Sequence, residues 1–352
     1  MVELSSPLRI GLIADNPNFP AGWDQVVEKV KIADQLGYDS VWLGEAWGYD
    51  VFTSLADLAR VTQRIKLGTG IVNVFSRSPG VIASSIATLD ERSGGRMLLG
   101  LGSSGANVIE HWHGVKFEKP LRRLREYAEI INMILRREKL IYHGDIFQLE
   151  RGFKLQFTPL RKHIPIYIAA ITPKSIEQTG EIADGVLPVY WPKEQYPEMR
   201  RMLDAGAAKA GRAAGSASIA PYITTEILLD ESQRPAARDR ARGPVAFYIG
   251  RMGVFYAEML ARYGYVADVE AVKRGWEAGP KTAAQGVSDA LLDATAIVGT
   301  PQEMAAQLLA WQQLGVDELV ITMPAGTPEQ AGQALEALLH AVRAARTRQD
   351  AP

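Results

Sequence analysis

Short apolar runs alternate along the chain with longer segments in which apolar residues recur every three or four positions. This is the pattern of buried strands followed by amphipathic helices. The apolar runs predict eight strands, at 8–13, 40–44, 65–71, 96–102, 165–170, 184–189, 218–229 and 318–323. The longer segments predict helices, at 23–36, 52–62, 79–92, 121–135, 174–182, 194–213, 301–314 and 328–346. This regular alternation of strand and helix is what a parallel sheet with crossover helices requires.

Eight such units favour an α/β fold of the (β/α)8 TIM-barrel type over a doubly wound sheet. No G-x-G-x-x-G follows the first strand, which weighs further against a dinucleotide-binding fold. A small hairpin is expected at 141–149, with its turn at His143-Gly144-Asp145.

The stretch between the seventh and eighth strands is too long for a single βα unit. A second helical piece is expected at 269–276, after one continuous helical face formed by Val245, Tyr248, Met252, Phe255, Met259 and Tyr263. We therefore expect one domain over residues 1–352, with a helical insertion at 230–300 between strands seven and eight. Insertions on this side of a barrel usually shape or cover the site, so a lid is favoured, with a dimer or scaffold extension as the alternative.

Composition narrows the class of protein. The formal net charge is -1, whereas a dedicated nucleic-acid binder should carry a basic excess. The chain has no Cys, which excludes disulfides, thiolate zinc sites and thiol catalysis. No apolar run of ~18 residues predicts a membrane span, and no signal-peptide pattern is found at the first residues. A cytoplasmic enzyme acting on a small molecule, without a nucleic-acid or membrane partner, is the expectation.

Active sites of these barrels lie at the carboxyl ends of the strands, so the residues there are the candidates. In strand order they are Asp15; Glu45 and Trp47; Gly70, Ile71 and Asn73; Gly102, Ser103, Ser104 and His111; and Ala170, Ile171 and Thr172. This aromatic, glycine-rich and hydroxyl-rich rim suits a flat, partly apolar ring system held by a few polar anchors.

Each candidate also has a plainer explanation. Glu45 could cap the next helix near its positive end, Trp47 and Trp191 could fill the core, and the glycine run at 100–105 could serve tight turns. His111 and His113 have no third ligand nearby, so no metal site is expected. The serines are not in a G-x-S-x-G motif, whereas a glycosidase with two carboxylates stays open from the residues alone.

The segment VWLGEAWGYDVFTSLADLARVTQRIKLGTGIVNVFSRSPGVIASSIATLDERSGGRMLLGLGSSG (41–105) resembles the luciferase-like flavin-dependent oxidoreductases. The likeness is greatest to their branch that uses the deazaflavin coenzyme F420, as methylenetetrahydromethanopterin reductase does. It extends over nearly the whole chain, through the blocks at 108–127, 165–188, 247–265 and 298–304.

The resemblance implies a barrel with an insertion after strand seven, usually a homodimer, with the coenzyme across the carboxyl-end mouth. It implies a non-prolyl cis peptide at Gly70-Ile71, a backbone bulge that presses on one face of the ring, and an amide at Asn73 that could bond the ring edge. It places the coenzyme phosphate near loops whose matching positions here are Ser103, Ser104, Ala170, Ile171, Thr172 and Gly185.

The activity implied is hydride transfer between F420 and an activated C=C, C=N or C=O, with Trp47 as a stacking wall. Glu45 would anchor the ring edge or donate a proton, with Glu110 and His111 as alternates. Several F420-dependent dehydrogenases have His after the acidic residue, and the Glu45-Ala46 pair here disfavours alcohol oxidation by that imidazole. An FMN-dependent monooxygenase and a non-catalytic flavin-binding protein are the alternatives.

Overall fold

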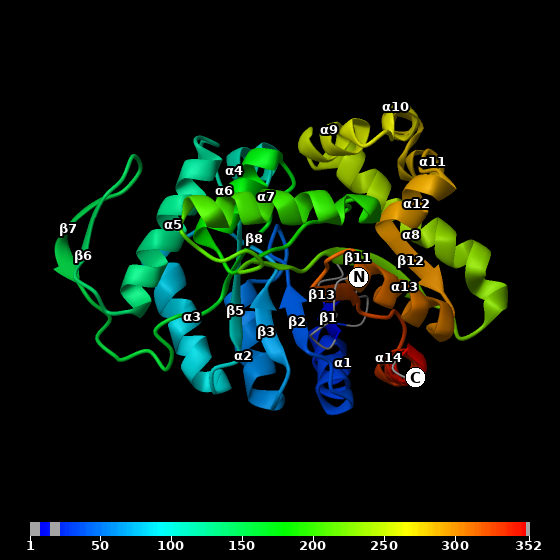
Figure 1. Cartoon of the computed structure of the whole chain (residues 1–352), viewed down its shortest axis with the longest axis horizontal. Coiled ribbons are helices and arrows are strands. Elements are labelled where there is room, and N and C mark those ends of the chain that lie inside the picture. The colour runs from blue at the N-terminus through cyan, green and yellow to red at the C-terminus, as the bar shows by residue number, and fades with distance from the viewer. Residues whose placement is uncertain (1–7, 15–21, 350–352) are drawn as a thin grey trace.

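The computed structural model describes residues 8–14 and 22–349, and its centre is a curled sheet of parallel strands (Figure 1). Its strands are β1 (Arg9–Ile13), β2 (Ser40–Leu43), β3 (Lys66–Thr69), β5 (Met97–Gly102), β8 (Ile166–Ile168), β9 (Gly185–Val186), β10 (Ser218–Ile219), β11 (Tyr222–Ile227) and β13 (Glu318–Thr322). Every residue of β2 and β5 is buried. Because both faces of such a sheet are covered, its strands are continuous apolar runs, and this is why the runs predicted them.

The sheet curls round until its two ends meet on one segment. Hydrogen bonding passes from β9 through β8, β5, β3, β2 and β1 to β13 and β11. The strands β10 and β11 are consecutive pieces of segment 218–227; β10 pairs with β9, and β11 pairs with β13. The expected parallel α/β sheet is therefore confirmed.

Helices cover the outside of the sheet, with bounds within a few residues of those predicted. They are α1 (Trp23–Leu36), α2 (Val51–Val61), α3 (Pro79–Ser93), α5 (Pro120–Leu135), α6 (Pro173–Ile182), α7 (Tyr196–Lys209), α13 (Pro301–Gln313) and α14 (Pro328–Gln349). The short elements β4 (Val72–Asn73) and α4 (Ala106–His111) lie where loops were expected, whereas η1 (Lys193–Gln195) lies at the start of the helix predicted at 194–213. None of the helices in the described part of the chain is long and apolar enough to cross a membrane.

The predicted hairpin is present as β6 (Leu140–His143) and β7 (Gln148–Phe153), and it projects beyond α5 at one end of the molecule (Figure 1). Its turn begins one residue later than expected, at Gly144. The buried carboxylate of Glu126 on α5 accepts hydrogen bonds from the backbone N–H groups of Asp145, Ile146 and Phe147. That carboxylate fixes the turn, which the local sequence alone does not reveal.

The segment between β11 and β13 differs from the expectation in two ways. It contains η2 (Glu231–Gln233), α8 (Arg234–Arg251), α9 (Phe255–Arg262), α10 (Val266–Ala278), α11 (Pro280–Gln285) and α12 (Asp289–Thr295). The prediction that one helical face continues through Phe255 is wrong, because the helix breaks at Gly253, whose φ is 85°. The segment 230–300, expected as a helical insertion, also contains β12 (Ala296–Gly299), a buried strand that pairs with β11.

Side chains fill the inside of the curled sheet. A compact cluster consists of Trp42, Leu98, Tyr167, Leu187, Ala220 and Val320. The indole of Trp42 lies against Gly68, where a Cβ atom would be 2.3 Å from its Cε3. The interior below the mouth is therefore a packed core, and any ligand site must lie at or above the strand ends.

Candidate functional site

The peptide bond between Gly70 and Ile71 is cis, as expected from the resemblance. It lies where β3 gives way to β4, and the Gly70 N–H donates to the carbonyl of Leu43, at the end of β2, over 2.6 Å. A Cβ atom at residue 70 would be 1.4 Å from the hydroxyl of Tyr222 on β11. A larger residue at this position would therefore require the Tyr222 side chain to move.

Glu45 follows β2 and is ion-paired with Arg77, which follows β4. Its two carboxylate oxygens each accept a hydrogen bond of 2.7 Å from the guanidinium, and the two side chains are only 12% and 18% exposed. The Arg77 guanidinium also pairs with Asp50 and lies 5.3 Å from the ring centroid of Phe52. The hydrogen bond to Glu45 is the main reason why the pKa of Arg77 is raised. Glu45 does not cap α2, because Asp50 occupies that position.

The carboxylate of Asp50 has a different environment. Burial pushes the pKa of Asp50 up, but hydrogen bonds from Thr53 and the charge of Arg77 outweigh it, so the pKa lies below its usual value. The cluster of Glu45, Asp50 and Arg77 thus holds two carboxylates around one guanidinium at the edge of the mouth.

Asn73 ends β4 and is buried, with its amide already engaged. Its Oδ1 accepts hydrogen bonds from the backbone N–H groups of Phe75 and Ser76, at 3.0 and 2.8 Å. This leaves Nδ2 as the donor toward His113 Nε2, 3.3 Å away. Asn73 therefore ties the α4–α5 loop to β4, and the predicted contact with a ring edge stays a prediction.

The predicted residues at the ends of the next two strands lie close to Ile71. A Cβ atom at Gly102 would be 2.8 Å from Ile71 Cδ1 and 3.4 Å from the Cβ of Ala169, so Ile71 packs directly against this glycine. Ser103 and Ser104 follow it, half-buried, and the Ser103 hydroxyl donates to the carbonyl of Ser104 over 3.2 Å. The fold thus brings the ends of β4, β5 and β8 together around Ile71.

Thr172 caps α6, as predicted. Its hydroxyl accepts from the N–H of Ser175 and the Ser175 hydroxyl accepts from the N–H of Thr172, which forms a capping box. Ala170 is buried and Ile171 is half-buried. Gly185 instead begins β9 and pairs with Tyr167 in the middle of β8, where a Cβ atom would be 2.3 Å from the tyrosine ring. Asp15 lies outside the described residues.

Trp47 and His111 come together on an open groove of about 450 Å³. The groove lies between the β2–α2 loop, α4, α8 and α10, and its lining includes Trp47, His111, Trp112, Phe247, Arg251 and Trp276. Trp47 is 54% exposed and Trp112 63% exposed, so neither fills the core. Trp191, by contrast, is buried and packs edge-on against Tyr263. For Trp191 the plainer explanation, that it fills the core, is therefore correct.

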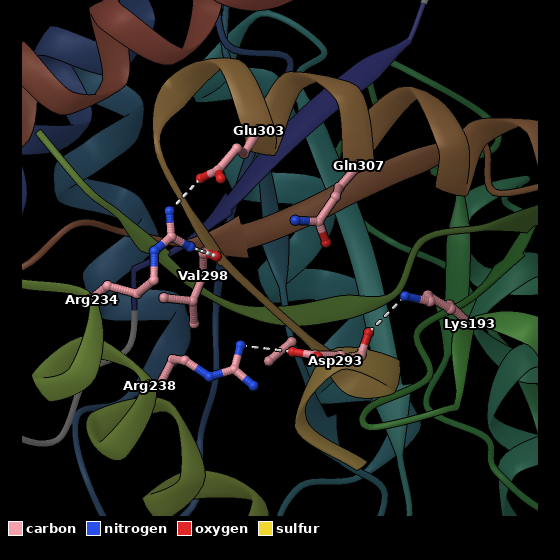
Figure 2. Close-up of a pocket in the computed structure, with 8 residues that line it drawn as sticks. Lys193, Arg234, Arg238, Asp293, Val298, Glu303 and Gln307 are labelled. Atoms are coloured by element: carbon pink, nitrogen blue, oxygen red, sulfur yellow. Dashed lines mark hydrogen bonds and ion pairs between the residues drawn. The ribbon is translucent and has the colours of Figure 1, made fainter. Parts of the chain in front are cut away.

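A second pocket, of about 310 Å³, lies between α8, β12 and α13 (Figure 2). Arg234 pairs with Glu303 at 2.6 Å, and Arg238 pairs with Asp293 at 2.8 Å. Lys193 donates to the Asp293 carbonyl over 2.9 Å. Both arginines are ion-paired and Lys193 is bonded to a backbone carbonyl, so this pocket joins α8 to its neighbours. The functional candidates therefore lie in the mouth and the groove.

Arg251 and Trp276 were not among the predicted site residues, and the pairing of Arg77 with Glu45 was not predicted. Arg77 stands in the loop after the third predicted strand, and its pairing with Glu45 could have been suspected from the two strand ends. Nothing local marks Arg251 or Trp276, which reach the groove only because α8 and α10 pack beside α4.

Comparison with known proteins shows which family this chain belongs to. The model of the luciferase-like monooxygenase family matches residues 7–318. A Mycobacterium tuberculosis protein named as a coenzyme F420-dependent oxidoreductase is 34% identical, over 86% of this chain and 91% of its own. The 5,10-methylenetetrahydromethanopterin reductase of Archaeoglobus fulgidus is 34% identical, over 84% of this chain and 89% of its own.

A solved structure, the coenzyme F420-dependent tetrahydromethanopterin reductase from Methanopyrus kandleri, superposes with a TM-score of 0.82 and 25% identity. The match covers 96% of this chain and 98% of that one. The curled parallel sheet is therefore the luciferase-like form of the TIM-barrel fold. From the family match over most of its length, and from the two relatives at 34% identity, we conclude that this chain belongs to the luciferase-like monooxygenase family.

Proposed function

We propose that this protein is an F420-dependent oxidoreductase that transfers a hydride between the deazaflavin coenzyme and a C=C, C=N or C=O bond of a small organic substrate. The observation that carries the proposal is the 34% identity, over 86% of the chain, to a relative named for that coenzyme. The agreement of a second relative, named as a methylenetetrahydromethanopterin reductase, favours F420 over FMN.

The residues at the mouth fit a large planar ring. The strands beneath are buried, yet Glu45, Gly70, Ile71, Ser103, Ser104, Ile171 and Thr172 all keep partial exposure at their ends. Ile71 and Ile171 offer apolar surface, and the serines and Thr172 offer hydroxyl groups. A half-apolar, half-hydroxyl surface above a packed core is what a flat ring with a polar tail requires. These residues would hold the coenzyme, which when bound supplies or accepts the hydride.

Glu45 is suited to orient rather than to donate a proton. Both of its oxygens already accept hydrogen bonds from Arg77, and a proton on the carboxylate would remove the charge that attracts the guanidinium. Its remaining lone pairs can accept a hydrogen bond from a bound ring edge. Arg77 is then a positioning residue, which acts through Glu45.

His111 is the better placed group for moving a proton to or from the substrate. It is exposed on the wall of the groove that Trp47 also lines, and an imidazole can donate a proton from one ring nitrogen and accept one at the other. Glu110, the other alternate, accepts a hydrogen bond from the N–H of Phe117 over 3.1 Å, on the side of the α4–α5 loop. Proton transfer by His111 and stacking by Trp47 are parts of this proposal.

We also propose that residues 1–352 act as one domain, that the helices of segment 230–300 form a lid over the mouth, and that the protein is a cytoplasmic homodimer. The carbonyl of Met252, at the end of α8, approaches to 3.8 Å from the Cβ position of Gly105, so this segment borders the loop after β5. Sedimentation of the purified protein tests the dimer directly.

Titration of the purified protein with F420 and with FMN, followed by fluorescence, tests the coenzyme. We expect saturable F420 binding and much weaker binding of FMN. Tight FMN binding with oxygen consumption would instead establish the monooxygenase alternative. Coenzyme binding without turnover over a broad substrate panel would favour a non-catalytic protein.

The variant E45Q tests the role of the ring-edge anchor. We expect the Kd for F420 to rise about tenfold, the loss of roughly 1.4 kcal/mol that one weakened charge-assisted hydrogen bond produces. E28Q, a change of the same kind on the outside of α1, is the matched control. Equal coenzyme affinity and turnover in the two variants would remove Glu45 from the site.

A further inference from the structure

The groove beside the mouth is walled by aromatic rings from four separate parts of the chain. Trp47 comes from the β2–α2 loop, Trp112 from the end of α4, Phe247 from α8 and Trp276 from α10. Its volume of about 450 Å³ lies in the range of small-molecule sites. Because Trp47 and Trp112 are both more than half exposed, these rings offer apolar area to a ligand.

The indole of Trp276 is held rigidly in this wall. Its Nε1 donates to the carbonyl of Ala246 over 3.1 Å. The ring occupies the space beside Gly250, where a Cβ atom would be 2.1 Å from Nε1. Protein contacts from a glycine and a backbone carbonyl on α8 thus fix the position of this indole of α10.

Arg251 gives the groove a positive charge. Its guanidinium carbon stacks 4.5 Å from the ring centroid of Trp276, and the side chain is exposed. Earlier on the same helix, Arg234, Arg238, Arg240 and Arg242 are each ion-paired with a carboxylate. Within the ranges 8–14 and 22–349, no carboxylate forms an ion pair with Arg251.

The rest of the groove wall, as far as the structure describes it, carries no negative charge to compensate Arg251. Its other polar lining residues are Asn107 and His111, and none of the described lining residues is acidic. An anion that enters can therefore replace water at the guanidinium without displacing a protein carboxylate. A stacked guanidinium is also restricted in its rotation, so it loses little freedom when it binds a planar anion.

We propose, on the basis of the proposed function, that this groove binds the substrate, and that the substrate combines a flat apolar ring with an anionic group. The ring lies among the indoles, and the anionic group pairs with Arg251. The groove adjoins the coenzyme-binding end of the sheet, because Trp47 follows β2 and α4 follows the β5 loop that carries Ser103 and Ser104. Arg251 and the aromatic wall thus determine substrate specificity.

Calorimetric titration with 2-naphthoate and with its neutral analogue 2-naphthamide tests this proposal on the full chain. We expect 2-naphthoate to bind more tightly than the amide, R251M to weaken naphthoate binding about tenfold, and the amide to be unaffected. R274M removes a well-exposed arginine of α10 that pairs with Glu270, and it is the matched control. W47L, at an exposed position where folding is not at risk, should weaken both probes several-fold.

Three outcomes would overturn the proposal: no binding of 2-naphthoate, equal loss in R251M and R274M, or an F420 affinity that falls in R251M while naphthoate binding does not. The last result would assign the groove to the coenzyme. The proposed function is tested apart from this, since F420 binding to the unaltered protein is measured without naphthoate. If the unaltered protein bound 2-naphthoate but not F420, the proposed coenzyme would be rejected and the proposal that the groove binds a ring with an anionic group would stand.

Discussion

Replacing Arg77 by methionine removes the charge between Glu45 and Asp50 while keeping most of the side-chain volume. Two guanidinium hydrogen bonds of 2.7 Å to Glu45 are lost, in a pair whose side chains are 18% and 12% exposed. Hydrogen bonds to charged groups contribute about 1.5–3 kcal/mol each, and leaving one member of a fully buried pair alone costs about 3–5 kcal/mol. Because this pair keeps some contact with water, we expect R77M to lower the free energy of unfolding by about 2–4 kcal/mol.

A double-mutant cycle isolates the pair from the rest of the site. E45Q alone should cost about 1–2 kcal/mol, less than R77M, because Arg77 keeps Asp50 as a partner. The loss of stability in the double variant E45Q/R77M should be smaller than the sum of the two single losses. The difference, which is the coupling free energy, should be about 2 kcal/mol. Urea denaturation followed by circular dichroism measures all four proteins.

The matched control is the exposed pair of Glu28 and Lys31 on α1, whose side chains are 52% and 36% exposed. A surface pair of this kind contributes about 0.2–0.5 kcal/mol. If the coupling between Glu45 and Arg77 were as small as that, the guanidinium would not be holding the carboxylate, and the argument that Glu45 is unsuited to donate a proton would be refuted.

Two further predictions concern stability. G68A should lower the free energy of unfolding, measured by urea denaturation, by about 1–3 kcal/mol, since the new Cβ would be 2.3 Å from Trp42. The control G48A, whose new Cβ meets nothing within 4 Å, should be nearly neutral. Equal effects of the two variants would contradict the packing seen inside the sheet. The second prediction concerns His163, whose Nε2 lies 3.0 Å from Asp184, and this hydrogen bond raises the pKa of His163. Burial pushes the pKa of Asp184 up, but hydrogen bonds from His163 and from the Ile166 N–H outweigh burial, so the pKa of Asp184 is lowered. The pair should therefore stabilise the fold most between about pH 4 and 6.5, the ordinary values of the two groups. Its contribution is lost as pH rises through the raised pKa of His163 or falls through the lowered pKa of Asp184. Urea midpoints of the unaltered protein and H163Q, measured against pH, should converge at alkaline pH, and a constant gap would contradict this assignment.

The elements of the sheet were predictable because the signals for them are local. Burial on both faces makes β2 and β5 continuous apolar runs, and α3 begins at Pro79 after a Ser78 cap, as its sequence indicates. The short strand β12 was missed, because four apolar residues after a helix give no periodicity to distinguish a strand from a helix end.

The partners within the site were decided by the tertiary structure. Glu45 was recognised as a candidate from its place after a strand, yet only the curl of the sheet brings Arg77 to both of its oxygens. Likewise, Trp47 and Arg251 are distant in sequence and share a groove only because the helices after β11 pack beside α4. Secondary structure follows from neighbours along the chain, whereas contacts between strand ends depend on how the whole sheet curls. The amino-acid sequence alone therefore determined the kind of fold and the candidate strand ends, and three-dimensional packing determined which charges and rings face one another.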